Sequence, residues 1–162
     1  MDSRTAAEFV NQVLLDLNRR DYIRASRHFA EDVTLTGAEF AALNGRDAVI
    51  EHFRQSDAAL SDSSLDVLDV LVGDTEAGST RIGVELVLTG THTSAFALGA
   101  AGPAIAPTGR RVAIPVFWAM TVKDGKIERV SHYWDMFRVL AGLQLAAGTS
   151  APIGASGAEP PM

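Results

Sequence analysis

The chain has 162 residues, which suits one compact domain, and 47% of them are hydrophobic, enough for a substantial core. It contains no cysteine, so disulfides, thiolate metal sites and cysteine nucleophiles are excluded. The net charge of −6, with lysines and arginines dispersed, argues against nucleic acid and anionic membranes as partners and favours a neutral small molecule. No stretch has the roughly 18 unbroken apolar residues of a membrane span, and the N-terminus lacks an apolar signal, so we expect a cytoplasmic protein.

The N-terminal part of the chain predicts two helices and a short strand. Residues Thr5 to Glu8 have the spacing of a capping box, and apolar side chains then recur at helical intervals to about residue 19. A shorter helix is expected over 21–29. An extended segment is expected at 33–36.

A third helix is predicted over 44–56. Asn44 is its candidate N-cap, and Phe53 marks its apolar face. His28 and His52 fall on the predicted helices, where a lone histidine more often has a structural role than a catalytic one.

From residue 64 onward the hydrophobic period changes to two. The strands predicted from this pattern cover 65–72, 80–92, 111–123 and 126–135. Helices followed by long strands indicate an α+β domain with its helices packed on one face of a curved antiparallel sheet. After about Ala147 the composition becomes Gly, Ala, Ser and Pro, so we expect a domain over 1–147 and a flexible tail over 148–162.

The dipeptide Asp124-Gly125 favours a two-residue turn, which would set the register of the last two strands and bring Ile114 opposite Asp135. Because side chains alternate along a strand, six residues are predicted to share the helix-covered face: Ile114, Val116, Trp118, Met120, Tyr133 and Asp135. The opposite face would carry Phe117, His132 and Trp134. Such an aromatic outer face predicts contact with a second subunit, most simply in a homodimer, with His132 buried there.

Asp135 is the first candidate catalytic residue. An apolar environment disfavours a charged carboxylate, which suits a group that must accept and donate a proton near neutral pH. The alternative is that Asp135 only caps a helix over MFRVLAGLQL, and the two roles can coexist. Arg129 would also point inward in this register, which fits poorly unless it lies at the rim of the sheet.

His92 is the second candidate. The alternation along 82–88 places it on the same apolar face, within roughly 10 Å of Asp135, so it is either a second polar group of the site or a core histidine. The predicted substrate contacts are Ile114, Val116, Trp118, Met120, Tyr133, Phe53 and Phe96. A multi-ring ligand would need a cavity of about 300 Å³ or more.

Four motifs in order resemble the SnoaL-like polyketide cyclases of the nuclear transport factor 2-like superfamily: GTHTSAF at 90–96, PTGRRV at 107–112, DGKI at 124–127, and Asp135 followed by LAGLQL. The resemblance extends from the first helix to about Leu145. It implies a cone-shaped α+β fold around an apolar pocket, a homo-oligomer and cofactor-independent chemistry. It also implies that the strand-terminal aspartate, matching Asp135, is the acid and base of an intramolecular aldol ring closure.

Two departures bear on the substrate. The connection from 97 to 106 is longer than is usual in the family, and the family's terminal QLG is replaced by Gln144-Leu145-Ala146. The alternatives to a cyclase are an isomerase or epoxide hydrolase with the same pocket, and a non-catalytic binder of an apolar ligand. With four histidines in no paired spacing and no phosphate-binding glycine loop, we expect no metal or nucleotide cofactor.

Overall fold

The structure, a computed structural model, describes residues 1–37, 42–74, 78–97 and 104–145. In chain order the elements are α1 (Ser3–Asn18), α2 (Tyr22–Ser26), β1 (Phe29–Gly37), β2 (Leu43–Asn44), α3 (Arg46–Ala59), β3 (Ser64–Asp74), β4 (Thr80–Thr91), β5 (Phe96–Ala97), β6 (Ala104–Ile105), β7 (Arg111–Lys123), β8 (Lys126–Trp134) and α4 (Met136–Gly142). The expected tail, and residues 98–103 of the long connection, lie outside the described residues.

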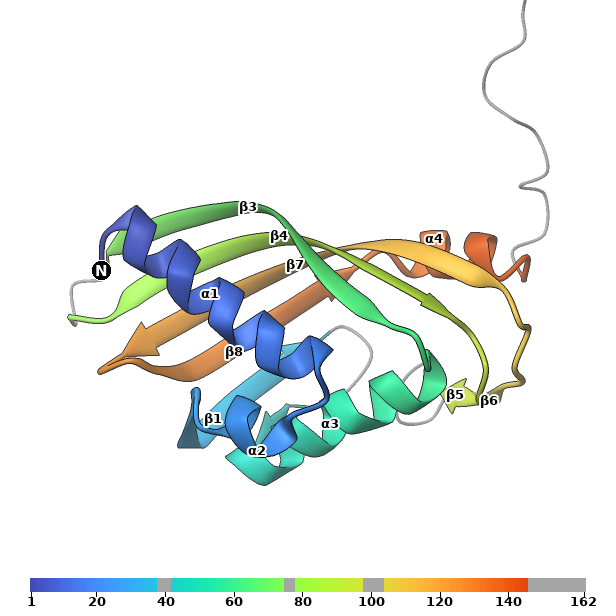
Figure 1. Cartoon of the computed structure of the whole chain (residues 1–162), viewed down its shortest axis with the longest axis horizontal. Helices are drawn as coiled ribbons and strands as arrows, with labels where there is room; N and C mark the ends of the chain where they lie inside the picture. The colour runs from blue at the N-terminus through green and yellow to red at the C-terminus, as the bar shows by residue number, and fades with distance from the viewer. Residues whose placement is uncertain (38–41, 75–77, 98–103, 146–162) are drawn as a thin grey trace, which may run out of the picture.

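A six-stranded sheet in the order β2-β1-β8-β7-β4-β3 forms the body of the molecule, and β5 and β6 pair separately. The sheet is curved, and α1, α2 and α3 lie on its concave side (Figure 1). This arrangement confirms the predicted α+β architecture. One strand pair departs from the antiparallel pattern: β1 adds to the free edge of β8 in the parallel direction.

The helices begin at other residues than predicted. The Asp2 carboxylate accepts a hydrogen bond from the Thr5 backbone N–H at 2.8 Å, so Asp2, and not Thr5, caps α1. Helix α2 has only five residues, because Phe29 already starts β1. The N-cap of α3 is Gly45, at a φ of +92° and without a side-chain cap, so the prediction for Asn44 is wrong. Asn44 instead pairs in β2 with the strand β1.

The long strands agree closely with the alternation in the sequence. β7 has the predicted bounds, β4 and β8 each end one residue earlier than predicted, and β3 extends two residues further toward the C-terminus. Their inner side chains and the apolar face of α1 build the core. Four of the six side chains assigned to the inner face are buried there, as predicted: Ile114, Val116, Trp118 and Met120.

The β7–β8 hairpin starts as predicted and then changes register. Asp124 and Gly125 form the turn with positive φ angles of 49° and 73°, and Val122 faces Ile127. The next pair is Thr121 with Arg129, so Glu128 is one extra residue in β8, a β-bulge.

The bulge reverses the predicted faces of the rest of β8. Trp118 pairs with His132 and Val116 with Trp134, which puts both β8 aromatics on the concave side. Tyr133 points to the convex side and is 56% exposed. Arg129 is exposed as well, which removes the misfit of an inward arginine.

Candidate functional site

A pocket of about 780 Å³ opens between α3, α4 and the sheet. The sheet contributes Leu88, Val112 and Ile114, and α4 contributes Val139 and Leu143. The pocket therefore exceeds the size expected for a multi-ring ligand. Its walls are mostly aliphatic and aromatic, which suits an apolar molecule.

His132 and Trp134, the residues that the bulge turns inward, both line this pocket. The His132 ring stacks on Trp134 with centroids 6.2 Å apart and meets Trp118 nearly perpendicularly at 6.1 Å. His52, from α3, also lines the pocket, and its ring centroid is 6.3 Å from that of His132. Two imidazoles thus lie close together in the lining of a mostly apolar cavity.

Burial controls the protonation of His132. Desolvation lowers the pKa of its imidazole from 6.5 to about 4, because the charged form loses water among the surrounding rings. At neutral pH the ring is therefore uncharged. A neutral imidazole can accept a proton from a bound molecule and return it to another atom.

Helix α3 supplies most of the other polar groups of the pocket. They are Glu51, His52, Gln55 and Ser56. The Gln55 side-chain amide donates to a Glu51 carboxylate oxygen at 3.1 Å, and the Ser56 hydroxyl donates to the His52 backbone carbonyl at 3.0 Å. These bonds fix the polar side chains along one face of the helix.

The structure places Asp135 outside the pocket. Its carboxylate accepts a hydrogen bond from the Arg138 backbone N–H at 3.1 Å and caps α4, and the side chain is 50% exposed. The prediction that Asp135 lies on the apolar, helix-covered face is wrong, because the bulge shifts β8 by one residue before this position. The capping alternative is confirmed.

His92 is fully buried, as its position in the strand pattern predicted, but it does not line the pocket. Its Nδ1 accepts a hydrogen bond from the Thr108 backbone N–H at 3.2 Å. Phe96, which does line the pocket, packs edge-on against the ring at 5.1 Å. The expectation that His92 and Asp135 both reach one cavity is therefore wrong.

The remaining predicted contacts divide into three groups. Ile114 and Phe96 line the pocket. Val116, Trp118, Met120 and Phe53 are buried in the core beside it, where Phe53 and Trp118 pack with ring centroids 5.6 Å apart. Tyr133 lies on the outer face.

Sequence reasoning missed His132, Trp134 and the polar face of α3. The signal for the first two was present: Ile127 and Val130 are both buried and three residues apart, which fits a strand only with one extra residue between them. The inward Arg129 was the second sign of a wrong register.

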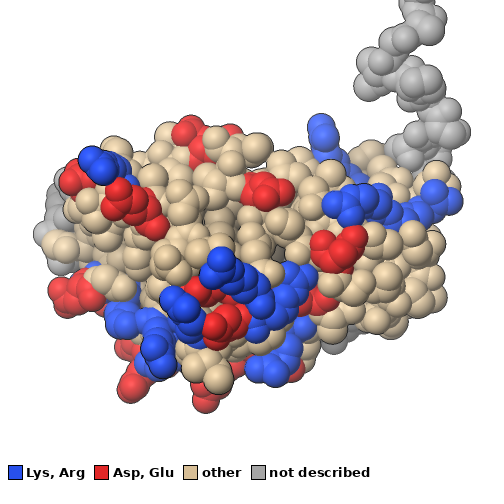
Figure 2. Space-filling model, viewed as in Figure 1, with Lys and Arg blue, Asp and Glu red and all other residues tan. Residues whose placement is uncertain are grey.

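The charged and metal-binding side chains of the described residues bear on whether there is another site outside the pocket. Basic and acidic residues are interleaved over the helical layer (Figure 2). Among the residues that the structure describes, no three histidine or acidic side chains are grouped as metal ligands. Within the same residues no helix has the length and apolar character needed to cross a membrane.

Solved structures share the fold at low sequence identity. A candidate polyketide cyclase from Xanthomonas campestris is 22% identical, with a TM-score of 0.68 over 86% of this chain and 97% of its own. SalBIII, an epoxide hydrolase/cyclase-like enzyme with a role in pyran ring formation in the polyether salinomycin, is 21% identical, with a TM-score of 0.66 over 85% and 95%. A protein of ketosteroid isomerase-like fold from Catenulispora acidiphila is 16% identical, with a TM-score of 0.67 over 86% and 94%.

These likenesses confirm the predicted α+β fold, which one of the three structures has under the description ketosteroid isomerase-like. No protein of curated function matches the sequence. The profile of the SnoaL-like polyketide cyclases matches residues 4–143, nearly all of the described chain. The chain therefore belongs to the SnoaL-like polyketide cyclase family.

Proposed function

We propose that this protein closes a ring in a polyketide-type natural product by cofactor-independent acid–base catalysis, with His132 as the proton-transfer group. The observation that carries the proposal is the neutral His132 imidazole in the wall of an apolar pocket. Membership of the cyclase family supports the reaction class. The role first assigned to Asp135 passes to His132, because Asp135 does not line the pocket.

The proposed reaction is an intramolecular aldol addition. His132 takes a proton from a carbon next to a carbonyl, and the resulting enolate carbon attacks a second carbonyl carbon of the same molecule. A carbon–carbon bond forms, the second carbonyl becomes an alkoxide, and the His132 imidazolium returns its proton to that oxygen. The product has the mass of the substrate, and no oxidant or cofactor is consumed.

The low pKa of His132 is compatible with this cycle. Burial penalises an isolated imidazolium, but an imidazolium beside an enolate is a close ion pair, and the opposite charge favours protonation. The surrounding rings of Trp118 and Trp134 exclude water, which strengthens that attraction. The His52 ring lies close enough to contact the same part of a ligand.

A surrogate substrate tests the assignment. 2-Acetylphenylacetone is an aromatic 1,5-diketone that can close a six-membered ring, and ring closure and α-hydrogen exchange in D₂O can be followed by NMR and mass spectrometry. We expect His132→Gln to lose at least about a hundredfold in rate, the usual scale for a general acid–base group, and Asp135→Asn to stay within about threefold. The opposite ranking would return the catalytic role to Asp135.

Three other possible functions of the pocket give different results in assays of this kind. An epoxide hydrolase would leave the diketone unchanged and would open a test epoxide in H₂¹⁸O to a diol that carries the labelled oxygen. A non-catalytic binder would take up ligands of suitable shape without accelerating exchange in any of a panel of such ketones. An isomerase would exchange α-hydrogens and move a double bond without forming a ring.

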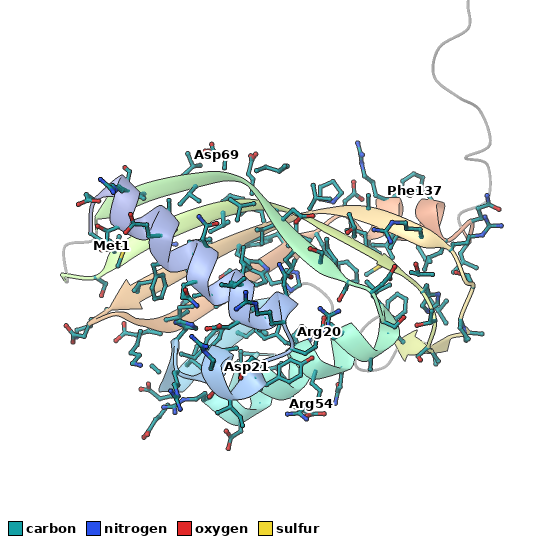
Figure 3. The ribbon with its side chains drawn as sticks, in the orientation of Figure 1. Met1, Arg20, Asp21, Arg54, Asp69 and Phe137 are labelled. Carbon is teal, nitrogen blue, oxygen red and sulfur yellow. The ribbon has the colours of Figure 1, made fainter. Side chains whose placement is uncertain are left out.

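The convex face of the sheet is the proposed dimer interface. Tyr133 and Leu71 are 56% and 54% exposed there, and Phe117 lies between their strands. Figure 3 shows Phe137 of α4 projecting on the side away from α1, α2 and α3. His132 and Trp134, expected in the interface, belong to the pocket instead. We expect a dimer by sedimentation velocity and a monomer after Leu71→Glu with Tyr133→Glu; a wild-type monomer would contradict the proposal.

A further inference from the structure

Polar and apolar side chains of the pocket come from different elements of the fold. The α3 wall carries Glu51, His52, Gln55 and Ser56. Three further lining residues carry polar side-chain atoms: Ser94, His132 and Trp134. The His132 ring is 6.3 Å from that of His52, and the Ser94 backbone N–H donates to the carbonyl of Ala59, the last residue of α3, at 3.4 Å. Most polar groups of the cavity therefore lie on or against α3, and the Trp134 indole is on β8 beside His132.

The part of the lining formed by β4, β7 and α4 offers no polar side chain. It consists of Leu88, Val112 and Ile114 from the sheet and Val139 and Leu143 from α4. A hydroxyl or carbonyl group held against this wall would lose its hydration and gain no hydrogen bond. Such desolvation without a partner is unfavourable.

The α3 wall is richer in acceptors than in donors. One N–H of Gln55 is already bonded to Glu51, and the Ser56 hydroxyl hydrogen is bonded to the His52 carbonyl. Glu51 is engaged at both oxygens, by Gln55 at Oε1 and by Arg54 Nε at 3.5 Å from Oε2, so the Gln55 amide oxygen and the Ser56 lone pairs are the acceptors best placed for a ligand. Hydroxyl groups are the ligand groups that such a wall recognises.

Building on the proposed function, we propose that the pocket holds a flat polycyclic ligand in one orientation, with a hydroxylated long edge on α3 and a bare edge against β4, β7 and α4. Gln55 and Ser56 are the specificity-determining residues of this orientation. The orientation decides which carbon of the ligand lies beside His132, so it selects the site of proton removal.

Two isomeric probes test the orientation. In 2,7-dihydroxyanthraquinone both hydroxyls lie along one long edge, whereas in 2,6-dihydroxyanthraquinone they lie on opposite edges. Both tryptophans of the chain, Trp118 and Trp134, adjoin the pocket, so quenching of intrinsic fluorescence reports binding. At about pH 6, with the phenols protonated, we expect the 2,7 isomer to bind about fivefold or more tightly, the scale of one or two neutral hydrogen bonds.

Matched variants assign the preference to α3. Gln55→Met with Ser56→Ala should bring the affinity ratio of the two isomers to about one, and Asn11→Met, at an exposed site on α1, should leave it unchanged. Equal binding of the isomers by the wild type, no binding of either, or a ratio unaffected by the double variant would overturn the proposal. The two proposals can fail separately. If the wild type prefers the 2,7 isomer but His132→Gln retains full α-hydrogen exchange activity, the proposed catalytic role of His132 is refuted and the proposed ligand orientation stands.

Discussion

The two ends of the concave face are built from the same strands but are covered differently. Helix α1 lies along β3 and closes one end with a continuous apolar face: Ala6, Val10, Val13, Leu14 and Leu17 are buried. At the other end α3 packs against β1 and α4 against β7, and the pocket remains between them. The positions of the covering helices therefore determine where the cavity lies. The strands cannot determine it alone, since their inward side chains are equally apolar at both ends.

A histidine at each end shows how the surroundings decide its role. At the closed end His28 Nε2 lies 2.8 Å from the buried carboxylate of Asp16, which also receives a hydrogen bond from Gln12. At the open end His132 is surrounded by rings, and burial lowers its pKa to about 4. The first histidine bridges two packed segments, and the second is a neutral group in the pocket wall.

Two leucine truncations measure the difference in packing between the ends. Leu14 in α1 and Leu143 after α4 are 3% and 2% exposed, so the accessible surface alone predicts equal losses. We expect Leu14→Ala to lower the free energy of unfolding by about 3 kcal/mol and Leu143→Ala by about 1.5 kcal/mol, because Leu143 lacks packing partners on its pocket side. Urea denaturation gives both values, and equal losses would mean that the pocket collapses around the open end.

The pH dependence of stability isolates His132. Its pKa is about 4 in the folded chain against 6.5 for an unperturbed histidine, so between these values the unfolded chain binds more protons. This contribution is fully present above pH 6.5 and is lost as the pH falls toward 4, by up to ~3 kcal/mol. His132→Gln should show a smaller loss over this range. An identical slope in wild type and variant would contradict the buried, neutral ring.

The smallest expected loss of stability comes from substituting Asp135, the first catalytic candidate of the sequence analysis. Asp135→Ala should lower stability by about 1 kcal/mol, the usual value of an exposed N-cap, while Asp135→Asn should lose little because asparagine also caps well. Neither change should abolish ligand binding in the pocket. Loss of probe affinity in the asparagine variant would show that Asp135 contributes to the site.

The order of helices and the positions of the long strands could be predicted because each is recorded in a local period and in turn residues such as Asp124-Gly125. The inner face of β7 followed from the same alternation. The parallel pairing of β1 with β8 could not, since nothing in either strand specifies its distant neighbour.

The candidate site was predicted only in part, because it depends on one residue. A single extra residue, Glu128, reverses the face of every following side chain, so it removed Asp135 and Tyr133 from the pocket and brought in His132 and Trp134. The polar face of α3 was hidden for another reason. Helix α3 packs against the sheet with one side only, so the polar residues next to that side line the cavity. The sequence does not show which side of the helix packs.

Titration of the four histidine side chains by NMR tests most directly whether the functional imidazole lies in the pocket. We predict one ring with a pKa near 4 whose signals are absent in His132→Gln, shift when 2,7-dihydroxyanthraquinone is added, and persist in Asp135→Asn. A His132 ring that titrates near 6.5 and does not respond to the probe would contradict the bulged register and the function built on it.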